Sequence, residues 1–270
     1  EPVLCRADRI SVVSERQKWA AIGELGAVGR LTFRTIGYDF TAVVPCALQP
    51  ETGRGPAPPA HRRAGIDEIF RVLWSGSYNT WSDVRTLVAG LERAMERNAR
   101  IEFVSTGGEV PGHDESTYRA LVERAAQSRF AERFDLRGWL VADELPAIVA
   151  GSDLGILTEK PIYEGMLGSK NRIVQWMSTG LAVAYNRSGD LGELLEQRRL
   201  GLTFAVGDAD GLADRLCWAA EHPEELARMA ERARSHALEH LTFSATTLGV
   251  AAWAANPVFA PDAGFKPASR

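Results

Sequence analysis

A turn-rich segment at residues 158–170 (TEKPIYEGMLGSK) brings together residue types that bind phosphate groups. It ends at Gly168 and Ser169, where we expect a helix to begin. The first amides of a helix have no partner within it and carry a partial positive charge, so they attract anions. Lys170 and Arg172 would add two cationic side chains to the first turn, and an arginine can bind phosphate oxygens in pairs. The pattern therefore predicts a cradle for a diphosphate.

Other interpretations of the candidate residues stay open at this point. Gly, Ser and Lys are common at helix starts, so an ordinary N-cap at Ser169 is the commoner interpretation of these residue types alone. His236 and His240 have the H-x-x-E-H spacing of inverted zinc peptidases. A third ligand is not evident in the sequence, and we expect no metal site.

The elements that would position this segment alternate regularly after residue 65, as a strand–helix rhythm of short apolar runs and amphipathic stretches. Short apolar runs occur at residues 71–75, 101–105, 134–136, 154–157, 181–185 and 202–205, and amphipathic stretches separate them at 83–96, 116–127, 143–150, 169–178, 191–197 and 209–221. Strands that alternate with helices predict a parallel sheet with helices on both faces, and uniformly apolar runs are typical of strands covered on both sides. The predicted fold class is therefore α/β, a doubly wound, Rossmann-like sheet. Ligands bind beyond the carboxyl ends of the strands in such sheets.

Composition divides the chain into four parts. Residues 49–65 (QPETGRGPAPPAHRRAG) lack apolar periodicity and are rich in Pro, Gly, Ala and Arg, which is typical of a linker. Residues 66–242 carry the strand–helix rhythm and form the predicted ligand-binding domain. Residues 1–48 precede the linker, and residues 243–270 hold a further helix and a tail rich in Pro and Ala.

The first part of the chain has a short strand–helix–strand pattern of its own. A β-branched run at residues 9–13 is followed by Ser14, with Gln17 at the capping-box spacing, and the helix would continue to residue 25. A second apolar run lies at residues 41–44. The sequence begins at Glu1 rather than Met, so we expect this part to be the remnant of a preceding domain.

Composition excludes several classes of protein and partner. The 270 residues are 45% hydrophobic and 24% charged, as in ordinary globular domains. A net charge of −4 favours neither nucleic acid nor an anionic membrane as partner, and the longest apolar runs fall short of the ~20 residues that span a bilayer. Three widely spaced cysteines offer no disulfide framework, which suits a reducing cytoplasm.

Several motifs in combination resemble the donor-binding half of GT-B glycosyltransferases of the family 4 (group 1) type. They are Trp74-Ser75-Gly76, Gly138-Trp139, Ser152-Asp153 before a strand, Glu164-Gly165, the run MSTGLAV at 177–183, Gly192-Glu193, and EHLTF at 239–243. The resemblance covers roughly residues 71–255. It implies that residues 1–48 come from the acceptor-binding domain that precedes this half, and that residues 243–270 form the crossover helix and tail.

The resemblance also implies roles for individual residues. Glu164 takes the place of the acid that contacts the donor sugar and is the candidate catalytic residue. Gln175 stands where the family usually has a second acid that binds the ribose, eleven residues from Glu164 instead of the usual eight. The other implied donor-binding residues are Gly76, Ser77, Trp139 and Leu140 beside the nucleotide, and Gly165, Met166, Leu167, Gly168, Ser169, Lys170 and Arg172 beside the sugar and diphosphate.

The implied chemistry is transfer of a sugar, with retention of anomeric configuration, from a nucleoside-diphosphate sugar to an acceptor hydroxyl. The resemblance implies no cofactor besides that substrate, since cations of the protein would stabilise the departing diphosphate. The expected partners are the nucleotide sugar, an unknown acceptor and the N-terminal domain of the same protein. The alternatives are another GT-B-type enzyme, an epimerase or a phosphorylase-like protein, and a non-catalytic module that binds sugar nucleotides.

Overall fold

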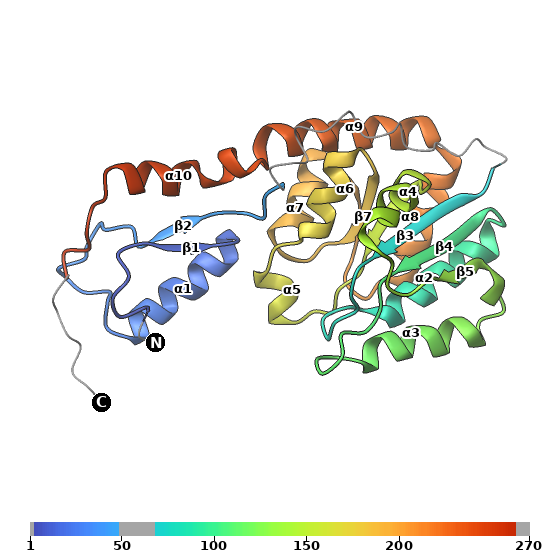
Figure 1. The fold of residues 1–270 in the computed structure, drawn as a ribbon, viewed down its shortest axis with the longest axis horizontal. Coiled ribbons are helices and arrows are strands. Elements are labelled where there is room, and N and C mark those ends of the chain that lie inside the picture. Colours follow the sequence, from blue (N-terminus) through green and yellow to red (C-terminus); the bar gives the residue numbers. More distant parts are fainter. Residues whose placement is uncertain (1–2, 49–67, 263–270) are drawn as a thin grey trace.

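The computed structural model describes residues 3–48 and 68–262, and its centre is a six-stranded parallel sheet (Figure 1). The strands are β3 (Phe70–Ser75), β4 (Ile101–Thr106), β5 (Phe134–Leu136), β6 (Leu154–Leu157), β7 (Ala182–Asn186) and β8 (Leu202–Phe204). Their order in the sheet is β5-β4-β3-β6-β7-β8. Every residue of β6 and β7 is buried, which explains why these runs are apolar throughout. The predicted α/β fold class is confirmed.

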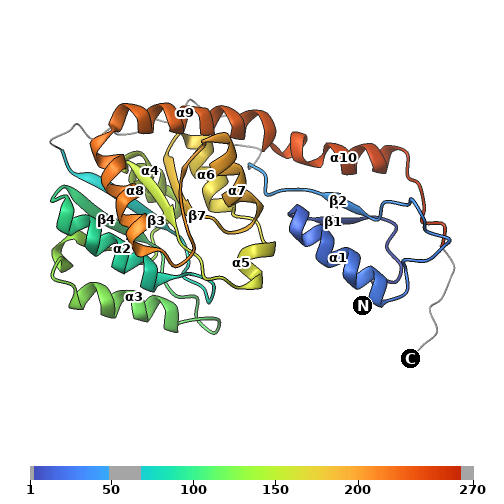
Figure 2. The same cartoon turned by 180° about the vertical axis from the view of Figure 1, so that it is seen from behind.

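Helices cover both faces of this sheet (Figures 1 and 2). They are α2 (Val84–Arg97), α3 (Ser116–Gln127), α4 (Leu145–Ala150), α6 (Asn171–Thr179), α7 (Gly189–Arg198), α8 (Ala209–Glu221) and α9 (Pro223–His240), with short 3-10 turns at Ala131–Arg133 and Ala142–Glu144. Helix α2 begins at an N-cap, Asp83, whose carboxylate accepts a hydrogen bond from the N–H of Thr86 at 3.0 Å. Its buried residues include Leu87, Leu91 and Met95, spaced four apart as in an amphipathic helix.

The segment between β6 and α6 differs from the sequence-based expectation in two ways. A five-residue helix, α5 (Tyr163–Leu167), lies in what the sequence predicted as a loop. Helix α6 begins at Asn171 rather than Ser169, because Gly168 has an extended backbone and Lys170 is the N-cap. Lys170 therefore precedes the first helical turn, and only Arg172 lies in it.

Residues 3–48 and 243–262 pack together and are called here the N-terminal unit. It contains the strands β1 (Ile10–Val12) and β2 (Thr41–Val43), paired in parallel, and the helices α1 (Glu15–Ala27) and α10 (Phe243–Ala255). Helix α10 follows α9 and carries the chain into this unit (Figure 1). Arg30 and Asp262 then close the unit with a buried ion pair at 2.6 Å.

The predicted start of α1 is present in detail. The Ser14 hydroxyl accepts a hydrogen bond from the N–H of Gln17 at 3.0 Å. The Gln17 side chain in turn accepts one from the N–H of Val13 at 2.7 Å. The predicted linker, residues 49–65, and the end of the tail, 263–270, lie outside the described residues, and the proposed domain boundaries stay predictions.

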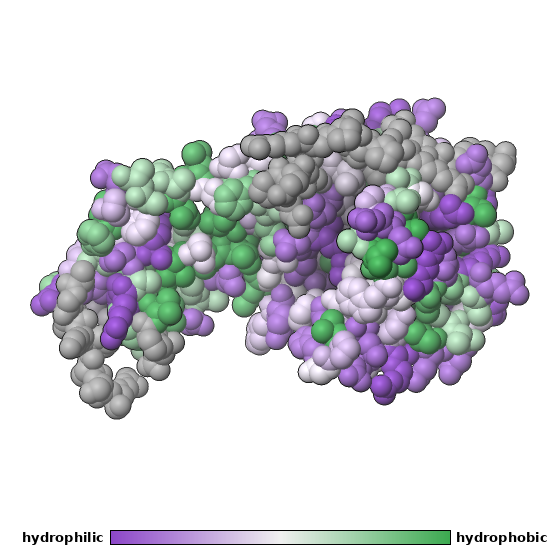
Figure 3. All heavy atoms as spheres, viewed as in Figure 1, coloured by the Kyte–Doolittle hydropathy of each residue, from purple (hydrophilic) through white to green (hydrophobic). Residues whose placement is uncertain are grey.

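Apolar side chains are exposed over much of the N-terminal unit (Figure 3). Trp19, Phe33 and Ile36 are among the exposed large hydrophobic residues. Apolar surface of this kind is typical of contact sites between domains or proteins. Within the described residues, no helix has the length and apolar character needed to cross a membrane.

Candidate functional site

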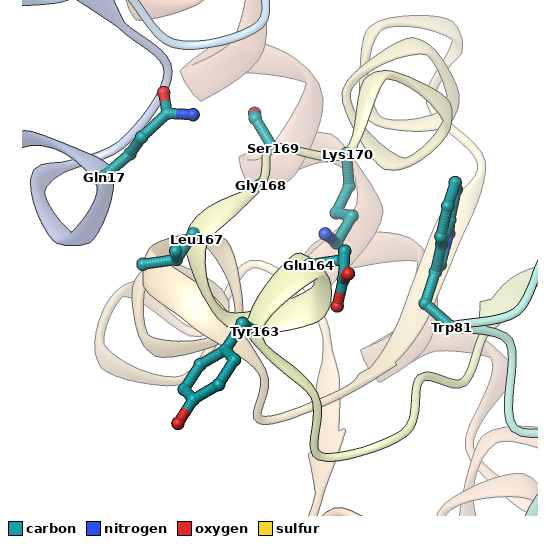
Figure 4. Close-up of a pocket in the computed structure, with 8 residues that line it drawn as sticks. All are labelled: Gln17, Trp81, Tyr163, Glu164, Leu167, Gly168, Ser169 and Lys170. Atoms are coloured by element: carbon teal, nitrogen blue, oxygen red, sulfur yellow. The ribbon is translucent and has the colours of Figure 1, made fainter. Parts of the chain in front are cut away.

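A pocket with a volume of about 530 Å³ lies between the α/β domain and the N-terminal unit (Figure 4). Its lining residues are Gln17 from α1, Trp81 from the loop after β3, and Tyr163, Glu164, Leu167, Gly168, Ser169 and Lys170 from the segment that joins β6 to α6. Five of the residues predicted from the sequence, Glu164, Leu167, Gly168, Ser169 and Lys170, are therefore brought together here.

The sheet topology places this pocket where a ligand is expected. From β3 the chain proceeds to β4 and β5 on one side, and from β6 to β7 and β8 on the other. The loops after β3 and β6 therefore flank the crevice where the strand order reverses. They are tied together by hydrogen bonds from the Asp83 N–H to the Thr158 oxygen at 3.0 Å and from the Lys160 N–H to the Trp81 oxygen at 2.8 Å. Trp81 lies in the first of these loops and Glu164 follows the second, so they flank the crevice from its two sides.

Glu164 lies in the first turn of α5 and is exposed to solvent. Figure 4 shows Glu164 and Lys170 between Leu167 and Trp81, whereas the Tyr163 ring points away from them. Within the described residues, the Glu164 carboxylate has no hydrogen-bond or ion-pair partner of its own. The carboxylate is therefore accessible to a ligand in the pocket.

Lys170 forms the cationic part of the pocket wall. Its ammonium nitrogen lies 3.3 Å from a carboxylate oxygen of Glu159 and 3.3 Å from the carbonyl oxygen of Gly165. Lys170 is also the N-cap of α6, and no side chain among the described residues caps the first amides of that helix. An ammonium group and uncapped helix amides thus lie together, which is the combination that attracts phosphate oxygens.

Arg172 lies behind the turn that follows β3 and does not line the pocket. Its guanidinium stacks on Trp74, with 5.0 Å to the ring centroid, and donates a hydrogen bond to the Ser77 carbonyl at 3.2 Å. Gly76 has φ +93°, and a Cβ atom there would lie 2.8 Å from a nitrogen of Arg172. Burial lowers the pKa of Arg172 to about 10, so it remains charged at neutral pH. The side chain supports the Gly76–Ser77 turn with a positive charge.

The remaining predicted residues do not line the pocket. Trp139 is 59% exposed, and its indole N–H donates to the Glu109 carbonyl at 2.9 Å. Leu140 and Gln175 are half-buried, the former in the loop after β5 and the latter on α6, and Met166 is exposed on α5. The roles predicted for these residues, as for those in the pocket, stay predictions.

Among the residues at this site, sequence reasoning did not identify Gln17, Tyr163 and Glu159. Gln17 was assigned only to the capping box of α1, and its place in the pocket wall depends on how the N-terminal unit packs. Glu159 comes two residues after the end of β6, a position at the carboxyl edge of the sheet that could have marked it. In the part of the chain that the structure describes, no three His, Cys, Asp or Glu side chains cluster as metal ligands would.

Known structures share this fold over nearly all of the chain. TarM from S. aureus superposes with a TM-score of 0.71 and 11% identity, over 93% of this chain and 45% of TarM. Anabaena HepE, solved with UDP and glucose, gives a TM-score of 0.67 and 17% identity over 92% of this chain and 63% of HepE. Sucrose-phosphate synthase from Thermosynechococcus elongatus gives 0.68 and 16% over 94% and 59%. The chain thus spans between about half and two thirds of these proteins.

No curated protein matches the chain. Its sequence does, however, match a family model. The family model described as "Glycosyl transferases group 1" matches residues 69–222, which is more than half of the chain and includes every strand of the large sheet together with α5 and α6. With the GT-B architecture of its structural neighbours, this match establishes that the chain belongs to the glycosyl transferases group 1 family.

Proposed function

We propose that this chain is the donor-binding half of a retaining glycosyltransferase that uses a nucleoside-diphosphate sugar. The observation that carries the proposal is the pocket beside the uncapped start of α6, in which Lys170 offers a cation and Glu164 a free carboxylate. The family match and the HepE structures with UDP and with UDP-glucose support it.

In this proposal the two charged groups of the pocket act on different parts of the donor. Lys170 and the first amides of α6 bind the diphosphate and stabilise the negative charge that develops on it as the sugar departs. The Glu164 carboxylate accepts hydrogen bonds from hydroxyls of the sugar. Gln17, which reaches the pocket from the N-terminal unit, helps to enclose the ligand and exclude water (Figure 4).

The nucleoside would extend from the diphosphate along the carboxyl edge of the sheet. Arg172 holds the Gly76–Ser77 turn and adds positive charge behind it. Trp139 and Leu140 lie in the loop after β5, where an exposed indole can stack on a base. Gln175 is the candidate for the ribose hydroxyls, as a neutral hydrogen-bonding group.

Calorimetric titration with UDP, GDP and ADP tests the binding step. We expect at least one nucleoside diphosphate to bind, and Lys170→Gln to weaken that binding about tenfold or more, the scale of a charge-assisted hydrogen bond. Lys160→Gln is the matched control, because Lys160 is a nearby lysine that donates to the Thr80 carbonyl at 2.7 Å and does not line the pocket. Absence of binding, or equal effects of the two substitutions, would refute the proposal.

A further inference from the structure

Glu159 is a fully buried carboxylate directly beneath the pocket, and no role has yet been given to it. Its side chain is 1% exposed. Its backbone is fixed by the Asn186 side chain, which accepts from the Glu159 N–H at 3.2 Å and donates to the Glu159 carbonyl at 2.6 Å. The hydroxyl of Tyr185 donates to one carboxylate oxygen at 2.6 Å. The carboxylate therefore cannot move without breaking this framework.

The second carboxylate oxygen of Glu159 pairs with the Lys170 ammonium. It has no hydrogen bond of good geometry within the described residues, but the Lys170 ammonium lies 3.3 Å away. Lys170 has three N–H donors, and its two protein contacts, to Glu159 and to the Gly165 carbonyl, are both longer than the 2.7–2.9 Å usual for charge-assisted bonds. At least one donor remains for the pocket that Lys170 lines.

We infer that Glu159 is a positioning residue, which holds the Lys170 ammonium at the pocket wall, where it can donate to a phosphate oxygen of the ligand. This inference rests on the proposed function. The Lys170 side chain is only 9% exposed, and a buried charge is costly unless an opposite charge lies close by. Glu159 is that opposite charge.

The groups around Glu159 act on its pKa in opposite directions. Burial raises the pKa of Glu159, and the charges of Lys170 and Arg172 and the Tyr185 hydrogen bond act against that rise. Glu164 lines the same pocket from α5, and Arg16 of α1 acts electrostatically on Tyr185. The two cations that act on Glu159, Lys170 and Arg172, favour its ionised form against the effect of burial.

The substitution Glu159→Gln separates positioning from simple electrostatics, because the two give opposite signs. A carboxylate that acted only by its charge would repel a diphosphate, so its removal would strengthen binding. If Glu159 positions Lys170, removal weakens the binding of the nucleoside diphosphate about tenfold.

A double-mutant cycle with Lys170→Gln tests whether Glu159 acts through Lys170. We expect Glu159→Gln to change affinity little once Lys170 is neutral, because the pair then no longer exists. Glu196→Gln is the control for loss of one negative charge, since Glu196 is half exposed and pairs with Arg187 at 2.8 Å in α7, outside the pocket. It should leave the affinity for the nucleoside diphosphate unchanged.

Several outcomes would overturn the inference. Unchanged or tighter binding by Glu159→Gln would do so, as would an equal loss in the Lys170→Gln background. If Glu159→Gln fails to fold, Glu159→Asp keeps the charge but shortens its reach toward Lys170, and wild-type affinity in that variant would equally refute positioning. If the wild-type chain itself binds no nucleoside diphosphate, the proposed function fails together with this inference, whereas normal wild-type binding confines the failure to Glu159.

Discussion

Replacing Gly76 by alanine probes the turn that Arg172 supports. Gly76 has φ +93°, a backbone conformation that costs an L-residue about 1–2 kcal/mol. The added Cβ would also lie 2.8 Å from one Arg172 nitrogen and 3.3 Å from its central carbon, so the guanidinium must shift. Displacing it weakens the hydrogen bond to Ser77 and the stacking on Trp74, which together contribute about 1–2 kcal/mol.

Gly207→Ala is the matched control for the backbone term alone. Gly207 has φ +77°, and a Cβ there would meet no atom within 4 Å. We expect urea denaturation to show a loss of about 2–4 kcal/mol in unfolding free energy for Gly76→Ala and about 1–2 kcal/mol for Gly207→Ala. The affinity for a nucleoside diphosphate should fall only in the Gly76 variant. Equal losses of stability with unchanged affinity would show that the Arg172 contact has neither a structural nor a binding role.

Three further substitutions test other parts of the molecule. Glu164→Gln should change the unfolding free energy by no more than about 0.5 kcal/mol, because the side chain is exposed. The same substitution should lower the transfer rate of the full-length enzyme, and a wild-type rate would refute the role proposed for Glu164. Gly155→Ala should destabilise the domain by about 1–3 kcal/mol in urea, since its Cβ would lie 2.6 Å from the Trp176 ring, and an unchanged midpoint would contradict that packing. Asp262→Asn leaves the buried Arg30 guanidinium uncompensated and should lower stability by about 3–5 kcal/mol, whereas a melting temperature like the wild type's would show that the ion pair is dispensable.

The sheet was predictable because its signal is local in sequence. Strands β5 and β6 have the predicted bounds, and helices α3 and α8 do as well. Buried parallel strands must be apolar on both faces, so each appears as a short apolar run between amphipathic stretches. The reversal of strand order, and with it the location of the crevice, depends on long-range pairing of β3 with β6 and was expected only from the fold class.

The site was less predictable, because tertiary packing determines which of several similar residues is buried and which faces the pocket. Glu159 and Glu164 are two acids five residues apart, and the family resemblance favoured Glu164 as the functional acid. In the structure Glu159 is buried and Glu164 is exposed, since α5 lifts the latter to the surface. Likewise nothing in the sequence around Arg172 indicates that its guanidinium packs on Trp74, nearly a hundred residues earlier.

The chain passes between its two parts twice, and the two passages are joined. The N–H of Leu48 donates to the Leu241 carbonyl at 2.8 Å, and Leu48 forms a β-bridge with Thr242, just before α10. Main-chain hydrogen bonding therefore holds these two segments to each other. A second contact between the two units lies at the start of α1. The Ser14 hydroxyl donates to the Leu167 carbonyl, and the partly exposed Arg16 pairs with Asp190 of α7 at 3.2 Å. A partly exposed ion pair of this kind is weakened by salt, so rising ionic strength should weaken this contact between the two units.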